Sequence, residues 1–188
     1  MIGRLNSRSK LAAGLLILAI VLVGARGYVH LNNPERRGLH SVAVDGPARL
    51  SPFLDEAGQP VSIEAFRGKL VVLNLWAQWC PPCMNEMPSL DRLAQTLPAD
   101  QFAIVTVTKD ELGDTASKRA FTLLGLSHLK LYLDPPGEIA KEVGARGLPT
   151  TLILGGDGTP LLFREGEIDW DSAEMVAYLR KLRVDHPG

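Results

Sequence analysis

A buried strand that runs into a pair of cysteines limits the fold of this chain more than any other feature. Residues 70–76, LVVLNLW, are apolar almost throughout, which is typical of a strand covered on both faces. Cys80 and Cys83, the chain's two cysteines, follow within the next seven residues. Apolar residues then recur at helical spacing over 84–97. The sequence therefore predicts an α/β fold in which the cysteines lie where a strand gives way to a helix.

Strand and helix patterns alternate through the rest of the chain. Because the amphipathic pattern continues past Pro88, we expect this proline to kink the helix rather than end it. Further strands are predicted at 102–108, 130–134, 150–154 and 161–166, and further helices at 114–126, 136–144 and 171–182. The predicted fold class is a mixed central β-sheet with helices on both faces.

The N-terminal residues have the composition of an export signal or a membrane anchor. Arg4, Arg8 and Lys10 precede an uncharged apolar run at 11–25. This run is short for a membrane span, which needs about 20 apolar residues, and its last residues, VGA, resemble a cleavage site ending at Ala25. We favour an uncleaved anchor, with a cleaved soluble form as the alternative. Positive charge at the N-terminus places the remainder of the chain outside the cytoplasm.

These patterns divide the chain into three parts. Residues 1–27 are the predicted signal-anchor or transmembrane segment, 28–60 the tether and the loop leading into the domain, and 61–184 the folded domain. The formal net charge is −1 and the cations are scattered. Since binding to nucleic acid requires a concentrated basic face, we exclude it as a partner.

The cysteine pair could be a structural staple, part of a metal site or a redox pair. A four-residue loop constrains the unfolded chain little, so a staple is disfavoured. A zinc site needs two further cysteine or histidine ligands, and the four histidines show no ligand spacing. Cys80, Cys83, Met84 and Met87 could together bind Cu(I), although both methionines also fit the apolar face of the helix. A Cu(I)-binding and transfer module stays as the alternative to redox chemistry.

A redox pair at a helix start has a defined division of labour. A thiolate at Cys80 would be stabilised by the unpaired N–H groups and the dipole of the helix, and Cys83 could then resolve the mixed disulfide. Pro81 and Pro82 have no N–H to donate to the Cys80 sulfur. We therefore expect weak activation of Cys80 and a bias toward reducing disulfides. A thiol oxidase or disulfide isomerase with the same site is the alternative.

The sequence WCPPC after an apolar strand, with GLPT at 147–150 before a later strand, resembles the thioredoxin superfamily. The resemblance extends over 42–182 and is closest to the membrane-anchored TlpA/ResA-like reductases. It implies a thioredoxin-like fold with Cys80 as the exposed nucleophile, Cys83 as the resolving thiol, and a redox-active disulfide between them. It also implies that Pro149 is a cis proline beside this disulfide rather than an ordinary loop proline.

Further site residues follow from the same resemblance. Glu86 matches an acidic residue that could move protons from Cys83, the alternative being a solvated or capping carboxylate. Asn74 stands where thioredoxins carry a buried aspartate. From the sequence pattern itself, we expect Lys109 and its two acidic neighbours, which follow a strand, to form a solvated turn rather than the edge of the site, and Trp76 to belong to the core.

The resemblance also implies a docking surface for client proteins, by which we mean proteins whose disulfides are reduced. The backbone of Leu148 would pair with a client strand, and Trp79, Pro81 and Pro82 would contribute to the same surface.

The expected function is that of a periplasmic thiol:disulfide oxidoreductase held at the bacterial inner membrane. It would reduce disulfides in exported clients, in cytochrome c maturation or in copper-site assembly of oxidases. A membrane electron donor would re-reduce the pair. No bound cofactor or metal is expected, because the dithiol is itself the redox centre.

Overall fold

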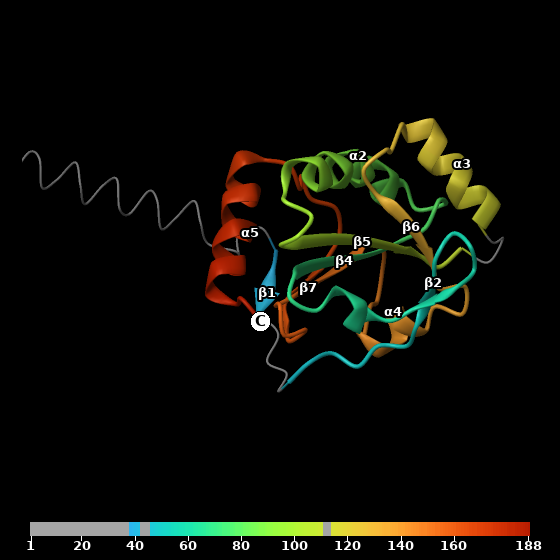
Figure 1. Ribbon diagram of the computed structural model, residues 1–188. Helices are drawn as coiled ribbons and strands as arrows, with labels where there is room; N and C mark the ends of the chain where they lie inside the picture. Colours follow the sequence, from blue (N-terminus) through green and yellow to red (C-terminus); the bar gives the residue numbers. More distant parts are fainter. Residues whose placement is uncertain (1–37, 42–45, 111–113) are drawn as a thin grey trace, which may run out of the picture. The chain divides into compact units, whose positions relative to one another are not determined.

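The structure is a computed structural model that describes residues 38–41, 46–110 and 114–188 (Figure 1). The predicted signal-anchor at 1–27 lies outside these ranges, as do residues 28–37 of the predicted tether. Within the described ranges, no helix combines the length and the apolar character needed to cross a membrane.

One mixed sheet forms the centre of the fold. Its strands are β1 (His40–Ser41), β2 (Phe53–Leu54), β3 (Pro60–Val61), β4 (Leu70–Trp76), β5 (Phe102–Thr108), β6 (Lys130–Leu133), β7 (Thr150–Leu154) and β8 (Pro160–Glu165). Among the described residues their order across the sheet is β1-β8-β7-β4-β5-β6-β2-β3. β4, β5 and β6 are parallel, and the other neighbouring pairs are antiparallel. The predicted mixed sheet is therefore confirmed.

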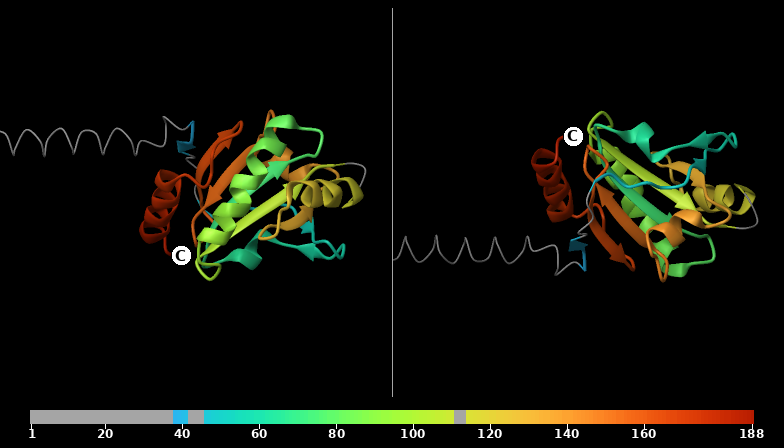
Figure 2. Two further views of the ribbon diagram at one scale, coloured as in Figure 1. Left: turned by 90° about the horizontal axis from the view of Figure 1, so that it is seen from above. Right: turned by 90° about the horizontal axis from the view of Figure 1, so that it is seen from below.

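Helices cover both faces of this sheet, as the sequence predicted. They are the 3₁₀ helix η2 (Ile63–Phe66) and the α-helices α2 (Pro81–Thr96), α3 (Asp114–Leu124), α4 (Glu138–Glu142) and α5 (Ala173–Asp185). α2, α3 and α5 lie on one face, while α4 and η2 lie on the other (Figures 1 and 2).

The apolar sequence of β4 follows from its central position. Every residue of β4 is buried. Successive side chains of a strand point to opposite faces. Leu70, Val72 and Trp76 pack in the cluster that includes α2 and α5, and Val71, Leu73 and Leu75 pack in the cluster that includes α4 and η2. Because both faces are covered, the strand reads as a continuous apolar run rather than an alternating one.

Helix α2 begins at Pro81, three residues before the start that the apolar pattern predicted, and continues through Pro88 to Thr96. Its first two positions are prolines, whose fixed φ suits the first turn and whose missing N–H groups cost no helical hydrogen bond there. The helix therefore starts immediately after Cys80, which is its N-cap.

The segment that leads into the domain contributes more to the sheet than the sequence indicated. β1 and β2 come from the predicted tether and loop at 28–60, and β3 crosses its boundary with the predicted domain. Leu39 is fully buried in the core cluster under α2 and α5. The sheet thus includes residues before position 61, where we predicted the folded domain to begin. Strands of two residues are too short to produce a periodic sequence pattern.

Candidate active site

Cys80 lies between the carboxyl end of β4 and the first turn of α2. Its backbone is extended, and its Sγ accepts a hydrogen bond from the Cys83 N–H at 3.3 Å. Pro81 and Pro82 occupy the two intervening positions and have no N–H. The Cys83 N–H is therefore the first backbone N–H after Cys80 that can donate to its sulfur, and it does so.

The two cysteines form a disulfide. The S–S distance is 2.08 Å and the Cα atoms are 5.3 Å apart. The resemblance implied an exposed Cys80, but in this oxidised form Cys80 is 4% exposed and Cys83 is 0% exposed. The Cys80 sulfur is bonded to a fully buried partner, which accounts for its low exposure. Both cysteines belong to the core cluster, but Cys80 also borders a surface pocket.

The pocket beside Cys80 has a volume of about 400 Å³ and brings the predicted docking residues together. Trp79, Pro81, Pro82 and Leu148 all line it. Trp79 is 58% exposed, although tryptophan side chains are on average highly buried. The Leu148–Pro149 peptide bond is cis, in agreement with the resemblance. That these residues bind a substrate stays a prediction, but their grouping is the one that such a role requires.

Lys109 also lines this pocket, so the prediction of a solvated turn is wrong for it. Its Nζ lies 6.0 Å from the centroid of the Trp79 ring, within the range of a cation–π contact. The sequence pattern could not show this contact, because the two residues follow different strands, β4 and β5.

The neighbouring Asp110 is buried, and the solvated-turn prediction is wrong for it too. Its Oδ2 accepts hydrogen bonds from the Gln78 N–H (3.1 Å), the Thr108 hydroxyl (2.9 Å) and the Ser117 hydroxyl (2.7 Å). Asp110 therefore ties the loop before Cys80 to β5 and α3. Glu111, the third residue of that predicted turn, lies outside the described residues.

Glu86 is a buried carboxylate, 3% exposed, in the second turn of α2. Its oxygens accept hydrogen bonds from Asn74 Nδ2 (2.7 Å), Trp170 Nε1 (3.1 Å) and the Ile168 N–H (3.2 Å). Burial raises the pKa of Glu86 to about 7, because these three bonds only partly offset the loss of hydration. The alternative of a solvated or capping carboxylate is therefore excluded.

None of these three partners was among the site residues that we predicted. Asn74 was noted only as a departure from thioredoxins, yet its Nδ2 bonds both Glu86 and, at 2.9 Å, the Thr151 hydroxyl on β7. Trp170 precedes α5 and is fully buried, and its backbone N–H donates to the Ser89 hydroxyl on α2. No local pattern signals such contacts, since Asn74 and Glu86 lie on different elements and the bonds from Asn74 to Thr151 and from Trp170 to Glu86 join residues more than 70 positions apart.

The raised pKa of Glu86 predicts a pH dependence of stability. The pKa is about 7 in the folded protein against 4.5 as the ordinary value, so between these limits the folded protein binds the extra proton. The free energy of unfolding should therefore fall as the pH rises from about 4.5 to 7, by up to about 3 kcal/mol. Denaturant unfolding across this range should show the decrease in the parent and not in Glu86→Gln. Parallel curves for the two proteins would contradict the prediction.

Met84 and Met87, the additional soft ligands considered for copper, pack with the core. Met87 is fully buried, and Met84 is partly buried against the same cluster. Trp76 is fully buried in that cluster as well, as predicted. These side chains thus have a packing role that accounts for their apolar character.

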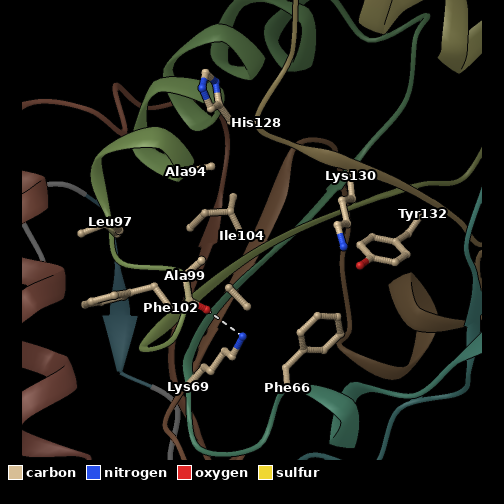
Figure 3. A pocket seen from close by; sticks show the side chains of 11 residues that line it. Phe66, Lys69, Ala94, Leu97, Ala99, Phe102, Ile104, His128, Lys130 and Tyr132 are labelled. Carbon is tan, nitrogen blue, oxygen red and sulfur yellow. Dashed lines mark hydrogen bonds between the residues drawn. The ribbon is translucent and has the colours of Figure 1, made fainter.

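A second cavity, of about 190 Å³, lies near the amino ends of β4, β5 and β6 (Figure 3). Phe66, Ile104 and Tyr132 contribute to its walls, and Lys69 beside it donates a hydrogen bond to the Ala99 carbonyl at 2.7 Å. Cys80 follows the carboxyl end of β4, at the other end of these parallel strands. This second cavity is therefore separate from the redox pair.

Comparison with known proteins agrees with this site. The AhpC/TSA family profile matches residues 44–159. The thiol-disulfide oxidoreductase ResA of Bacillus thuringiensis is 32% identical over 171 residues, covering 89% of this chain and 94% of that protein. The thiol:disulfide interchange protein CycY of Rhizobium leguminosarum is 35% identical over 102 residues, covering 54% of this chain and 53% of that protein.

The fold is likewise that of solved thioredoxin-like structures. The thioredoxin domain of a thiol-disulfide oxidoreductase from Bacteroides vulgatus superposes with a TM-score of 0.60 at 21% identity, covering 75% of this chain and 98% of that domain. At this identity the likeness establishes the thioredoxin-like fold alone. Together with the sequence matches and the Cys80–Cys83 disulfide, it leads to one conclusion: the chain belongs to the AhpC/TSA family and is a thiol-disulfide oxidoreductase related to ResA.

Proposed function

We propose that this oxidoreductase works as a reductant of disulfides in exported proteins, held at the bacterial inner membrane with its domain in the periplasm. The observation that carries the direction is the hydrogen bonding of Cys80. In the first turn of α2 its Sγ accepts from the Cys83 N–H, while Pro81 and Pro82 have no N–H to offer. A weakly stabilised thiolate leaves the dithiol form less favoured, which makes the pair more reducing.

The exchange itself takes two steps. In the reduced protein, the Cys80 thiolate attacks one sulfur of a client disulfide, and the other client sulfur leaves as a thiolate that takes up a proton. Cys83 then loses its proton and attacks the Cys80 sulfur, which releases the second client sulfur as a thiol. The client gains two electrons and two protons, and the protein forms the Cys80–Cys83 disulfide.

Glu86 is proposed to accept the proton of Cys83. The two residues are three positions apart on α2 and therefore lie on the same side of the helix. A carboxyl whose pKa is about 7 can accept and release a proton near neutral pH. Pro149 and Leu148 are proposed to hold the client strand beside Cys80, with Trp79, Pro81 and Pro82 forming the apolar part of the docking surface.

Re-reduction requires a dithiol donor in or at the membrane, and we propose that the segment at 1–27 keeps the domain near it. Clients in cytochrome c maturation or in copper-site assembly of oxidases are the proposed classes. Both rest on the resemblance to the TlpA/ResA-like branch described above.

The redox potential of the pair tests the proposed direction. Equilibration with dithiothreitol buffers should give a potential more negative than about −200 mV, outside the range of the oxidising members of the superfamily.

Replacing Pro82 with alanine should restore an N–H at the second helical position, which can reach the N-cap side chain. We expect the pKa of the Cys80 thiol to fall by about one unit and the potential to rise by about 20–30 mV.

Pro81→Ala is the matched control for this change. It alters the first helical position, whose N–H does not normally reach the N-cap side chain, so its potential should move much less. A pKa near 4 for Cys80 in the parent protein, or a potential close to the DsbA value of about −120 mV, would contradict the proposed direction.

A further inference from the structure

The pocket beside Cys80 carries positive charge on an otherwise apolar surface. Its lining includes Trp79 and Leu148, and two cationic side chains, Lys109 and Arg146. Lys109 follows β5, and Arg146 comes from the loop that leads to the cis proline. Among the described residues that line the pocket, none is acidic. A client segment that docks here therefore meets two cations from separate parts of the chain.

Lys109 is available to a client. Its ammonium group is held over the Trp79 ring at 6.0 Å, and within the part of the chain that the structure describes no carboxylate forms an ion pair with it. A cation–π contact uses the face of the ring and leaves the three N–H donors of the ammonium group for another acceptor. The contact thus positions a charge beside Cys80 without neutralising it.

Arg146 is partly engaged but still accessible. Its Nη2 lies 3.1 Å from Glu165 Oε2, and its backbone N–H donates to the other Glu165 oxygen at 2.6 Å. The Arg146 side chain is nevertheless 87% exposed. A guanidinium has five N–H donors, and an exposed ion pair contributes little free energy. A second carboxylate can therefore share this guanidinium with Glu165.

We propose that the clients of this site carry an acidic residue, aspartate or glutamate, next to the disulfide cysteine that Cys80 attacks. This inference deepens the proposed function and rests on it. The client segment is extended where it passes the cis proline, its apolar side chains contact Trp79 and Leu148, and its carboxylate lies between Lys109 and Arg146. The electron transfer is the two-step exchange given above, with the reduced Cys80–Cys83 dithiol as the reductant.

Three synthetic peptides test the charge preference. Each contains one intramolecular disulfide with the same apolar residues, and they differ only in a pair of flanking residues, which are Glu, Gln or Lys. The reduced full-length protein is mixed with each peptide, and the second-order rate of reduction is followed by chromatography. Because flanking charge also changes the intrinsic reactivity of a disulfide, every rate is divided by the rate with dithiothreitol. We expect the Glu peptide to be reduced about tenfold faster than the Lys peptide at low ionic strength, and this preference to shrink in salt.

Variants assign the preference to the two cations. Lys109→Gln combined with Arg146→Gln should abolish it. Lys141→Gln should retain it, because Lys141 is an exposed cation on the neighbouring helix α4 that pairs with Glu138 and does not line the pocket. Equal normalised rates for the three peptides in the parent protein would overturn the inference and leave the proposed reductase function standing.

The opposite failure is distinguishable. If the reduced protein reduces none of the peptides, the proposed direction is wrong. The rates at which the disulfide form of the protein oxidises the three reduced peptides are then compared instead. A preference for the Glu peptide in that direction would support the acidic client. Equal normalised rates there would overturn it.

Discussion

Replacement of Cys83 by serine should convert the protein from a catalyst into a trap for its clients. Cys80 would still attack a client disulfide, but the resolving thiol that normally lies against it would be missing. Turnover should fall by about three orders of magnitude or more, and a mixed disulfide between Cys80 and the client should accumulate. Non-reducing gel electrophoresis of membranes and periplasm would display the trapped species, and mass spectrometry would identify the client.

Cys80→Ser is the matched control for the trap. It retains the fold and Cys83 but lacks the sulfur that borders the surface pocket, so it should trap nothing. Trapping by Cys80→Ser but not by Cys83→Ser would show that Cys83, and not Cys80, is the attacking thiol. That outcome would reverse the division of labour between the cysteines.

Truncation of Trp170 to alanine should have the largest effect on stability that we predict. The side chain is fully buried in the core cluster under α2 and α5, and its Nε1 donates to Glu86 at 3.1 Å. Loss of a buried tryptophan leaves a cavity and typically costs about 3–5 kcal/mol of the free energy of unfolding. Urea denaturation at pH 7 would measure this loss directly.

Trp170→Phe separates packing from hydrogen bonding. It keeps most of the apolar volume but removes the N–H donor, so ionised Glu86 loses one of its three donors. The loss of stability should therefore be larger at pH 8, where Glu86 is ionised, than at pH 5, where it is protonated, by about 1–2 kcal/mol. In a Glu86→Gln background this difference should disappear. A Phe variant with the same loss at both pH values would show that the indole N–H does not stabilise the charged carboxyl.

Much of the fold could be predicted from local patterns, because the central elements have strong ones. The continuous apolar run of β4 and the helical spacing of α2 reflect burial on two faces and on one face respectively. The later strands and helices were placed to within about three residues for the same reason. The short strands β1, β2 and β3 were not predicted individually, since two residues give no period and their pairing depends on distant strands.

The site residues likewise fall into those that local motifs indicate and those whose surroundings depend on tertiary packing. Cys80, Cys83 and Pro149 lie in short motifs with fixed order, so the sequence was sufficient to select them. The environment of Glu86 depends on Asn74 and Trp170, which approach it only when β4, α2 and the loop before α5 pack together. Such partners carry no local signal, and for that reason the sequence identified the carboxylate without showing that it is buried.

The pairing of β1 with β8 limits how far the domain can lie from a membrane segment at 1–27. Gly38 has a φ of +68°, and a Cβ there would lie 1.9 Å from the Arg164 guanidinium, so this position favours glycine. Leu39 and β1 then fix the chain to the core and to β8. If residues 1–27 hold the protein in the membrane as proposed, the ten residues 28–37 connect the membrane segment to Gly38. Ten residues span at most about 36 Å when fully extended. In that case the length of this segment and the size of the domain together limit how far the Cys80–Cys83 pair can lie from the membrane, and a client must bring its disulfide within that limit to be reduced.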